Sequence, residues 1–138
     1  MDVIVETLVE APIEAVWRMF NEPADILMWD TSDDWYTTSV SNDLKVGARL
    51  QLRIESRLGG AGFDFGATYI EVQPMTVIAR RTDEGRHVRV EFRDASKATL
   101  VHQTFEAEAE PSINDQRRDW QTVLDNFARH VAAQTFPS

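Results

Sequence analysis

The stretch QRRDWQTVLDNFARHV, residues 116–131, decides the fold of this chain. Its apolar residues recur at the i, i+3, i+4, i+7 spacing of one helical face, whereas polar and charged residues occupy the other faces. The apolar face consists of Trp120, Val123, Leu124, Phe127 and Val131. The spacing therefore predicts one long C-terminal amphipathic helix. A helix with so bulky a face must lie on a sheet, where it either fills a core or covers an apolar cavity.

The segments before this helix predict that sheet. A β-branched run over 3–9 is followed by two short helices, at 13–21 after Pro12 and at 24–29 after Pro23. Alternating or β-branched segments separated by Gly, Asn, Asp and Pro turns then predict consecutive hairpins and a mostly antiparallel sheet. These strands are expected at 35–40, 48–56, 63–72, 76–82, 88–93 and 99–107.

The alternation within these strands shows that the sheet has one apolar face. Leu50, Leu52 and Ile54 alternate with charged or polar residues, as do Val88, Val90 and Phe92. We therefore predict an α+β helix-grip fold, in which a curved antiparallel sheet of about six or seven strands wraps around the C-terminal helix. With 138 residues, of which 43% are hydrophobic, the chain is expected to form one domain over 1–138.

Composition excludes several classes of partner. The formal charge of −9 disfavours nucleic acid and anionic lipid surfaces, and no apolar stretch approaches the length of a membrane span. The chain has no cysteine and no basic, apolar leader after Met1, so a cytoplasmic location is expected. Either a monomer or a homodimer fits the sequence.

Motifs for metal or nucleophilic chemistry are missing from the sequence. Asp30, Asp33, Asp34 and Asp43 lack the glycine turn and distal glutamate of a calcium loop, so a role in capping and turns is expected. The three histidines stand far apart, no G-x-S-x-G elbow occurs, and the glycines at 59–62 predict a hairpin that could also form a flexible cavity rim. We expect no metal and no cofactor.

Six strings carry a family resemblance. They are APIEAVW (11–17), WDTSDDW (29–35), NDLKVG (42–47), GFDF (62–65), TYIEV (68–72) and WQTVLDNF (120–127). Together they resemble the START-like, birch-pollen-allergen-like superfamily known as SRPBCC. Within it, the chain is similar to the bacterial branch named after the C-terminal domain of the heat-shock-protein-90 ATPase activator. The chain departs from the pattern at Ala48 and Asp119, where glycine is expected, and at Arg80, where an aromatic is common.

The resemblance and the aromatic residues together predict three possible functions. The first is binding or carriage of a small apolar ligand, such as a lipid, between the sheet and the C-terminal helix. The second is a protein-interaction module resembling the chaperone activator. The third is a cyclase- or hydrolase-like enzyme acting on an apolar substrate. Because the third ranks last, we expect a protein without catalytic activity. The residues predicted to line the cavity are Trp29, Trp35, Phe63, Phe65, Tyr69, Phe92, Trp120, Leu124 and Phe127.

Catalysis would need an acid or base inside the cavity with a shifted pKa. The residues to inspect for this role are Arg53, Asp64, Tyr69 and His102. The direction of His102 depends on the register of its strand. If Val101, Gln103 and Phe105 face inward, His102 is solvated and inert, which is the orientation we expect.

Overall fold

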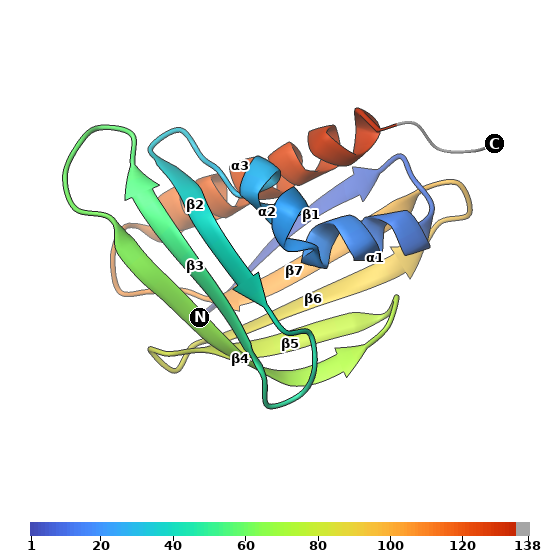
Figure 1. Ribbon diagram of the computed structural model, residues 1–138, viewed down its shortest axis with the longest axis horizontal. Helices are drawn as coiled ribbons and strands as arrows, with labels where there is room; N and C mark the ends of the chain where they lie inside the picture. The colour runs from blue at the N-terminus through green and yellow to red at the C-terminus, as the bar shows by residue number, and fades with distance from the viewer. Residues whose placement is uncertain (135–138) are drawn as a thin grey trace.

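A computed structural model describes residues 1–134 as a seven-stranded antiparallel sheet with three helices (Figure 1). The strands are β1 (Asp2–Val9), β2 (Trp35–Asn42), β3 (Arg49–Ser56), β4 (Phe63–Gln73), β5 (Val77–Thr82), β6 (His87–Asp94) and β7 (Thr99–Glu106). The helices are α1 (Ile13–Asn21), α2 (Pro23–Trp29) and α3 (Ile113–Ala132). The predicted α+β class and order of elements are confirmed, with element ends shifted by a few residues. The last residues of the predicted 1–138 domain, 135–138, lie outside the described part.

The strand order is β1-β7-β6-β5-β4-β3-β2, so every neighbouring pair except β1 and β7 is a sequence hairpin. Register places Val3 and Val88 on either side of Phe105, and all three are buried on one face. Irregularities in pairing occur between Thr37 and Ser39 on β2 and between Tyr69 and Glu71 on β4. Because bulges bend a strand and increase its twist, they help the sheet to curl into a half-barrel.

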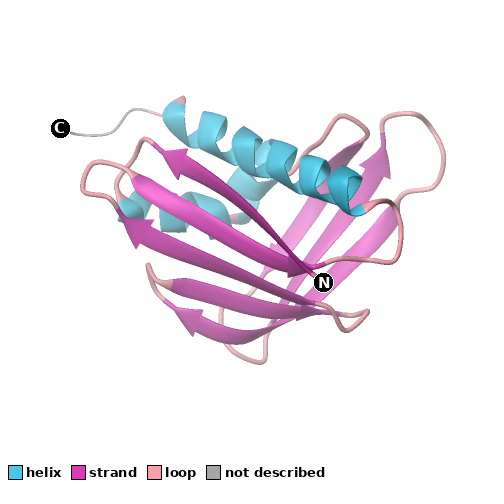
Figure 2. Cartoon of the chain, turned by 180° about the vertical axis from the view of Figure 1, so that it is seen from behind, coloured by secondary structure: helices cyan, strands magenta, loops and turns pink. Residues whose placement is uncertain are grey.

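Helix α3 runs across the concave side of the curled sheet (Figure 2). It packs mainly against β1 and also contacts α1 and α2. Its predicted face is confirmed, because Leu124, Phe127 and Val131 are fully buried and Trp120 and Val123 are partly buried. This arrangement is the predicted helix grip. None of the helices in residues 1–134 has the length and apolar character needed to cross a membrane.

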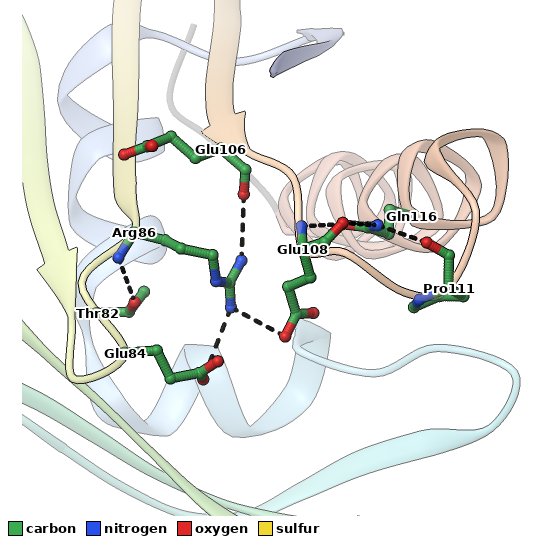
Figure 3. Close-up of polar contacts among 7 residues, drawn as sticks. All are labelled: Thr82, Glu84, Arg86, Glu106, Glu108, Pro111 and Gln116. Atoms are coloured by element: carbon green, nitrogen blue, oxygen red, sulfur yellow. Dashed lines mark hydrogen bonds and ion pairs between the residues drawn. The ribbon is translucent and has the colours of Figure 1, made fainter.

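A polar cluster around Arg86 anchors the start of α3 to the sheet (Figure 3). Arg86 donates to the Glu106 carbonyl (3.2 Å) and forms ion pairs with Glu84 (3.7 Å) and Glu108 (3.5 Å). Gln116, in the first turn of α3, binds the backbone of Glu108 and Pro111. The helix N-terminus itself is capped by Ser112, whose hydroxyl accepts from the Asp115 amide at 3.2 Å. These contacts fix where α3 enters the grip.

Candidate ligand-binding site on the concave face

The half of the concave face beneath α1 and α2 is filled by aromatic side chains. Phe127 of α3 lies 5.0 Å from Trp29 and 5.2 Å from Phe20, and Phe20 lies 5.3 Å from Phe92. The Trp29 indole also donates to the Met19 carbonyl at 3.0 Å. Edge-to-face contacts of this kind stabilise a packed core. Trp29 and Phe127, two of the predicted lining residues, therefore pack against each other, and Phe92, a third, joins them through Phe20.

The other half of the concave face, formed by β2, β3 and β4, is incompletely covered. Register directs Leu52 and Ile54 of β3 toward the same face as Phe65 and Phe63 of β4, and all four remain partly or largely exposed. Trp35 at the start of β2 contacts Phe63 edge-to-face at 5.3 Å, and these side chains are 37% and 44% exposed. Helix α3 packs on β1, at the opposite edge of the sheet, and so leaves this half open.

The hairpin beside Phe63 has the predicted glycine-rich form. Gly59 and Gly60 have φ values of 76° and 121°, which side chains rarely adopt, so glycine is required for this turn. Leu58 on the same hairpin is 79% exposed. The hairpin therefore forms a rim at the open end of the concave face.

The remaining predicted lining residues sit between the two halves. Trp120 of α3 stacks on Phe105 of β7 with centroids 4.0 Å apart and stays partly exposed. Leu124, one turn later, is 1% exposed, as is Tyr69 on β4. The structure thus brings Trp35, Phe63, Phe65 and Trp120 to incompletely buried positions and places the other predicted residues in the core.

Polar groups are built into this otherwise apolar interior. The Tyr69 hydroxyl donates to Asn42 Oδ1 at 2.5 Å, and the Asn42 amide donates to the Asn21 carbonyl at 2.8 Å. Thr37 donates to Asp30 Oδ2 at 2.8 Å, across the α2–β2 connection. Burial raises the pKa of the Tyr69 hydroxyl, and the nearby charge of Arg80 opposes this effect.

Asp30 is a carboxylic acid on the concave side of the sheet. The sequence predicted it only as a turn residue, together with Asp33, Asp34 and Asp43. Asp33 and Asp34 are exposed as expected, whereas Asp30 is held by Thr37. Burial raises the pKa of the Asp30 carboxyl above its ordinary value of 3.8, while the Thr37 hydrogen bond and the Arg80 charge lower it less. The sequence gives no local signal for this, because burial depends on β2 folding back beside α2.

Arg80 is a half-buried residue on the concave face that was not among the predicted site residues. It is paired with Tyr69 on β4 and with Val88 on β6, both of which are buried on the concave side. Its Nε atom is buried and has no hydrogen-bond partner among residues 1–134. The sequence did contain one indication: the family commonly has an aromatic residue at this strand position, where this chain has arginine.

The other residues inspected for catalysis face outward. His102 contacts Glu6 at 2.5 Å on the outer side, as expected from the burial of Val101, Gln103 and Phe105. Arg53 binds Glu55 at 2.7 Å and Asp64 at 3.3 Å, and Asp64 is exposed. Within residues 1–134, no group of three or more potential ligands is placed to hold a metal ion.

A separate hollow of about 270 Å³ lies outside the grip, where α1 and α2 approach the end of β2. Asn21 and Asn42, the residues linked to Tyr69, form part of its wall. Its other lining residues are Trp17, Arg18, Glu22, Pro23 and Leu44. The wall is mixed polar and apolar, so this hollow differs from the predicted aromatic cavity.

Comparison with known families agrees with this geometry. The family described as activator of Hsp90 ATPase homolog 1-like protein (AHSA1) matches residues 10–132. The chain belongs to the AHSA1-like family. An AHSA1-like protein from Aeromonas hydrophila, solved in solution, shares 40% identity and a TM-score of 0.87, with 96% of this chain and 93% of that chain covered. The predicted family resemblance is confirmed, and this AHSA1-like chain has the fold of a ligand-binding or activator-like domain.

Further solved structures are similar over the whole AHSA1-like domain. A protein from Cytophaga hutchinsonii shares 30% identity with a TM-score of 0.81, covering 98% of this chain and 97% of that one. A protein from Chromobacterium violaceum shares the fold at 21% identity, with a TM-score of 0.83 and 96% and 98% of the two chains covered. Among curated proteins, none matches this sequence.

Proposed function

We propose that this AHSA1-like protein binds a small apolar molecule on the uncovered half of its concave face, which is formed by β2, β3 and β4. The observation that supports this proposal is the partial exposure of inward-facing apolar side chains on β2, β3 and β4. Trp35 and Phe63 mark the entrance, and Phe65 and Trp120 lie further in. Burying these side chains against an apolar ligand would stabilise the complex in proportion to the area removed from water.

Flexibility at the entrance supports ligand entry. The glycine-containing hairpin between β3 and β4 can change its backbone angles more readily than other turns. An apolar molecule could therefore pass between this hairpin and α3 without unfolding the sheet. The expected cytoplasmic location and the oligomeric state stay predictions.

Native mass spectrometry of the purified protein, followed by thermal-shift screening with apolar metabolites, tests the proposal. A ligand that binds only the folded state stabilises it by about 2.7 kcal/mol at a hundredfold excess over its dissociation constant. Phe63→Ala should abolish the shift with little loss of stability, because Phe63 is 44% exposed. Leu58→Ala is the matched control, since Leu58 lies on the same hairpin and is 79% exposed.

A protein partner is the alternative that the family name supports. Such a partner would cover Trp35 and Phe63 from outside, and the charge of −9 would favour a basic partner surface. An absence of bound mass and of thermal shifts would overturn small-molecule binding. Co-purification of a partner that depends on Phe63 but not on Leu58 would then support the interaction module.

Catalysis ranks third. Catalysis requires an acid or base with a shifted pKa inside the site, and Asp30 has a raised pKa. However, one oxygen of its carboxyl group already accepts a hydrogen bond from Thr37 at 2.8 Å. The other residues considered for catalysis, except Tyr69, face outward. Product formation from a bound ligand, lost in Asp30→Asn while binding persists, would favour an enzyme over a carrier.

A further inference from the structure

Arg80 is a half-buried charged residue on the mostly apolar concave face, and its surroundings differ from those of Arg86. Arg86 has a backbone carbonyl at 3.2 Å and two glutamates within 3.7 Å of its terminal nitrogens. Arg80, by contrast, forms no ion pair within 4.0 Å in residues 1–134. The Nε atoms of both arginines are buried without a hydrogen-bond partner. Because Arg80 is half-buried and has no paired carboxylate in residues 1–134, its positive charge is incompletely compensated there.

The nearest candidates for a counter-ion do not complete it. Tyr69, the cross-strand partner of Arg80, places its hydroxyl close enough to interact with the guanidinium. This hydroxyl is neutral at physiological pH and donates to Asn42, so it supplies no counter-charge. Asp30 affects Arg80 through its charge, but the two groups are not in ion-pair contact and the Asp30 carboxyl is engaged by Thr37. An anion arriving from outside would find a fixed planar donor there.

The position of Arg80 also fits the geometry of an amphipathic ligand. Its strand neighbours on the concave face, Tyr69 and Val88, belong to the buried part of the sheet, whereas Trp35 and Phe63 lie at the open end. A ligand that entered past Trp35 and Phe63 would bring its leading end toward the interior. Apolar side chains, among them Phe65 and Leu52, would contact the rest of its length.

We propose that Arg80 receives the carboxylate of an apolar carboxylic acid, whose hydrocarbon part occupies the uncovered half of the concave face. This inference rests on the proposed function and specifies its ligand class. The guanidinium would donate paired N–H groups to the carboxylate oxygens, which neutral polar headgroups cannot match. Selectivity for an acid over an alcohol of equal length is therefore the property to measure.

Isothermal titration calorimetry with octanoic acid and octan-1-ol at pH 7 tests the inference. We expect the wild type to bind octanoate about tenfold or more tightly than octan-1-ol, because a hydrogen bond to a charged group is worth at least a factor of ten. Arg80→Gln should lose this preference and retain binding of the alcohol. Arg81→Gln is the matched control, because Arg81 is the next residue on β5 and is exposed.

The possible outcomes separate this inference from the proposed function. Equal affinities for acid and alcohol, unchanged in Arg80→Gln, would overturn the role of Arg80 and leave apolar binding intact. No binding of either compound, repeated with chains of six to twelve carbons, would overturn both.

Stability of the ligand-free protein gives a second, independent measurement. Because Arg80 has no ion-pair partner within residues 1–134, Arg80→Met should raise the midpoint of thermal unfolding, whereas Arg81→Met should change it little. A lower midpoint in Arg80→Met would identify Arg80 as a structural partner of Asp30 and contradict the inference.

Discussion

Gln116 and Glu108 exchange two hydrogen bonds across the connection from β7 to α3. The Glu108 amide donates to Gln116 Oε1 at 2.8 Å, and Gln116 Nε2 donates to the Glu108 carbonyl at 2.9 Å. Gln116 is only 4% exposed. Its buried side-chain amide pairs with the backbone of Glu108 in the way that a neighbouring strand would. One helical residue thereby provides hydrogen-bond partners for the backbone amide and carbonyl of Glu108 in the segment before α3.

Replacing this amide should destabilise the protein strongly. Gln116→Met keeps the size of the side chain but leaves the Glu108 amide and the Glu108 and Pro111 carbonyls without partners. The free energy of unfolding should fall by about 2–3 kcal/mol. Urea denaturation followed by circular dichroism measures this loss, with the exposed Gln134→Met as control. Equal stability of the two variants would show that water replaces these bonds at no cost.

Phe127 should behave as a core residue. Phe127→Ala removes contacts with Phe20 and Trp29 and should lower the free energy of unfolding by about 3–5 kcal/mol. Trp120→Ala should cost less, because Trp120 is partly exposed and has one aromatic partner, Phe105, among residues 1–134. The same urea experiment compares the two. A small cost for Phe127→Ala would place Phe127 at a cavity wall instead.

The raised pKa of Asp30 predicts a specific pH dependence of stability. In the unfolded chain Asp30 ionises near its ordinary pKa of 3.8, whereas the folded protein holds the proton to higher pH. The contribution of Asp30 to stability must therefore fall as the pH rises from 3.8 to the folded pKa of Asp30, and the loss persists above it.

Asp30→Asn isolates this effect while keeping an oxygen for Thr37. The stability of the variant relative to the wild type should increase with pH within that window and then become constant. Urea unfolding of both proteins at a series of pH values measures it. A difference independent of pH would mean that Asp30 ionises normally in the folded state.

Gly66 on β4 makes room for an ion pair on the outer face. Arg49 contacts Asp83 at 2.8 Å, and a Cβ atom at Gly66 would overlap the ends of both side chains. Gly66→Ala should therefore destabilise the protein slightly, because the added methyl group would displace the exposed Arg49–Asp83 ion pair. The cost should disappear in an Arg49→Ala background, which a double-mutant cycle by urea unfolding measures. If Gly66→Ala destabilised the Arg49→Ala variant equally, the destabilisation would come from the backbone of β4 and not from the ion pair.

Local patterns predicted most of the fold. The helical spacing from Trp120 to Val131 identified the buried face of α3, and strand alternation around Leu52 and Val90 identified the concave face. Whether α3 covers all of that face was not predictable, because it depends on the curl of the sheet and the path from β7. The partial burial of Asp30 and the position of Arg80 on the concave face likewise arise from contacts between segments distant in sequence.

The division of the concave face also gives the protein tryptophans in two distinct environments. Trp29 lies in the filled half and donates to a backbone carbonyl, whereas Trp35 stands at the open end and is 37% exposed. Their fluorescence should therefore differ, with Trp35 emitting at longer wavelength and open to quenching by acrylamide. Occupancy of the entrance would shield Trp35 and leave Trp29 unchanged, so the molecule contains its own optical reporter of binding.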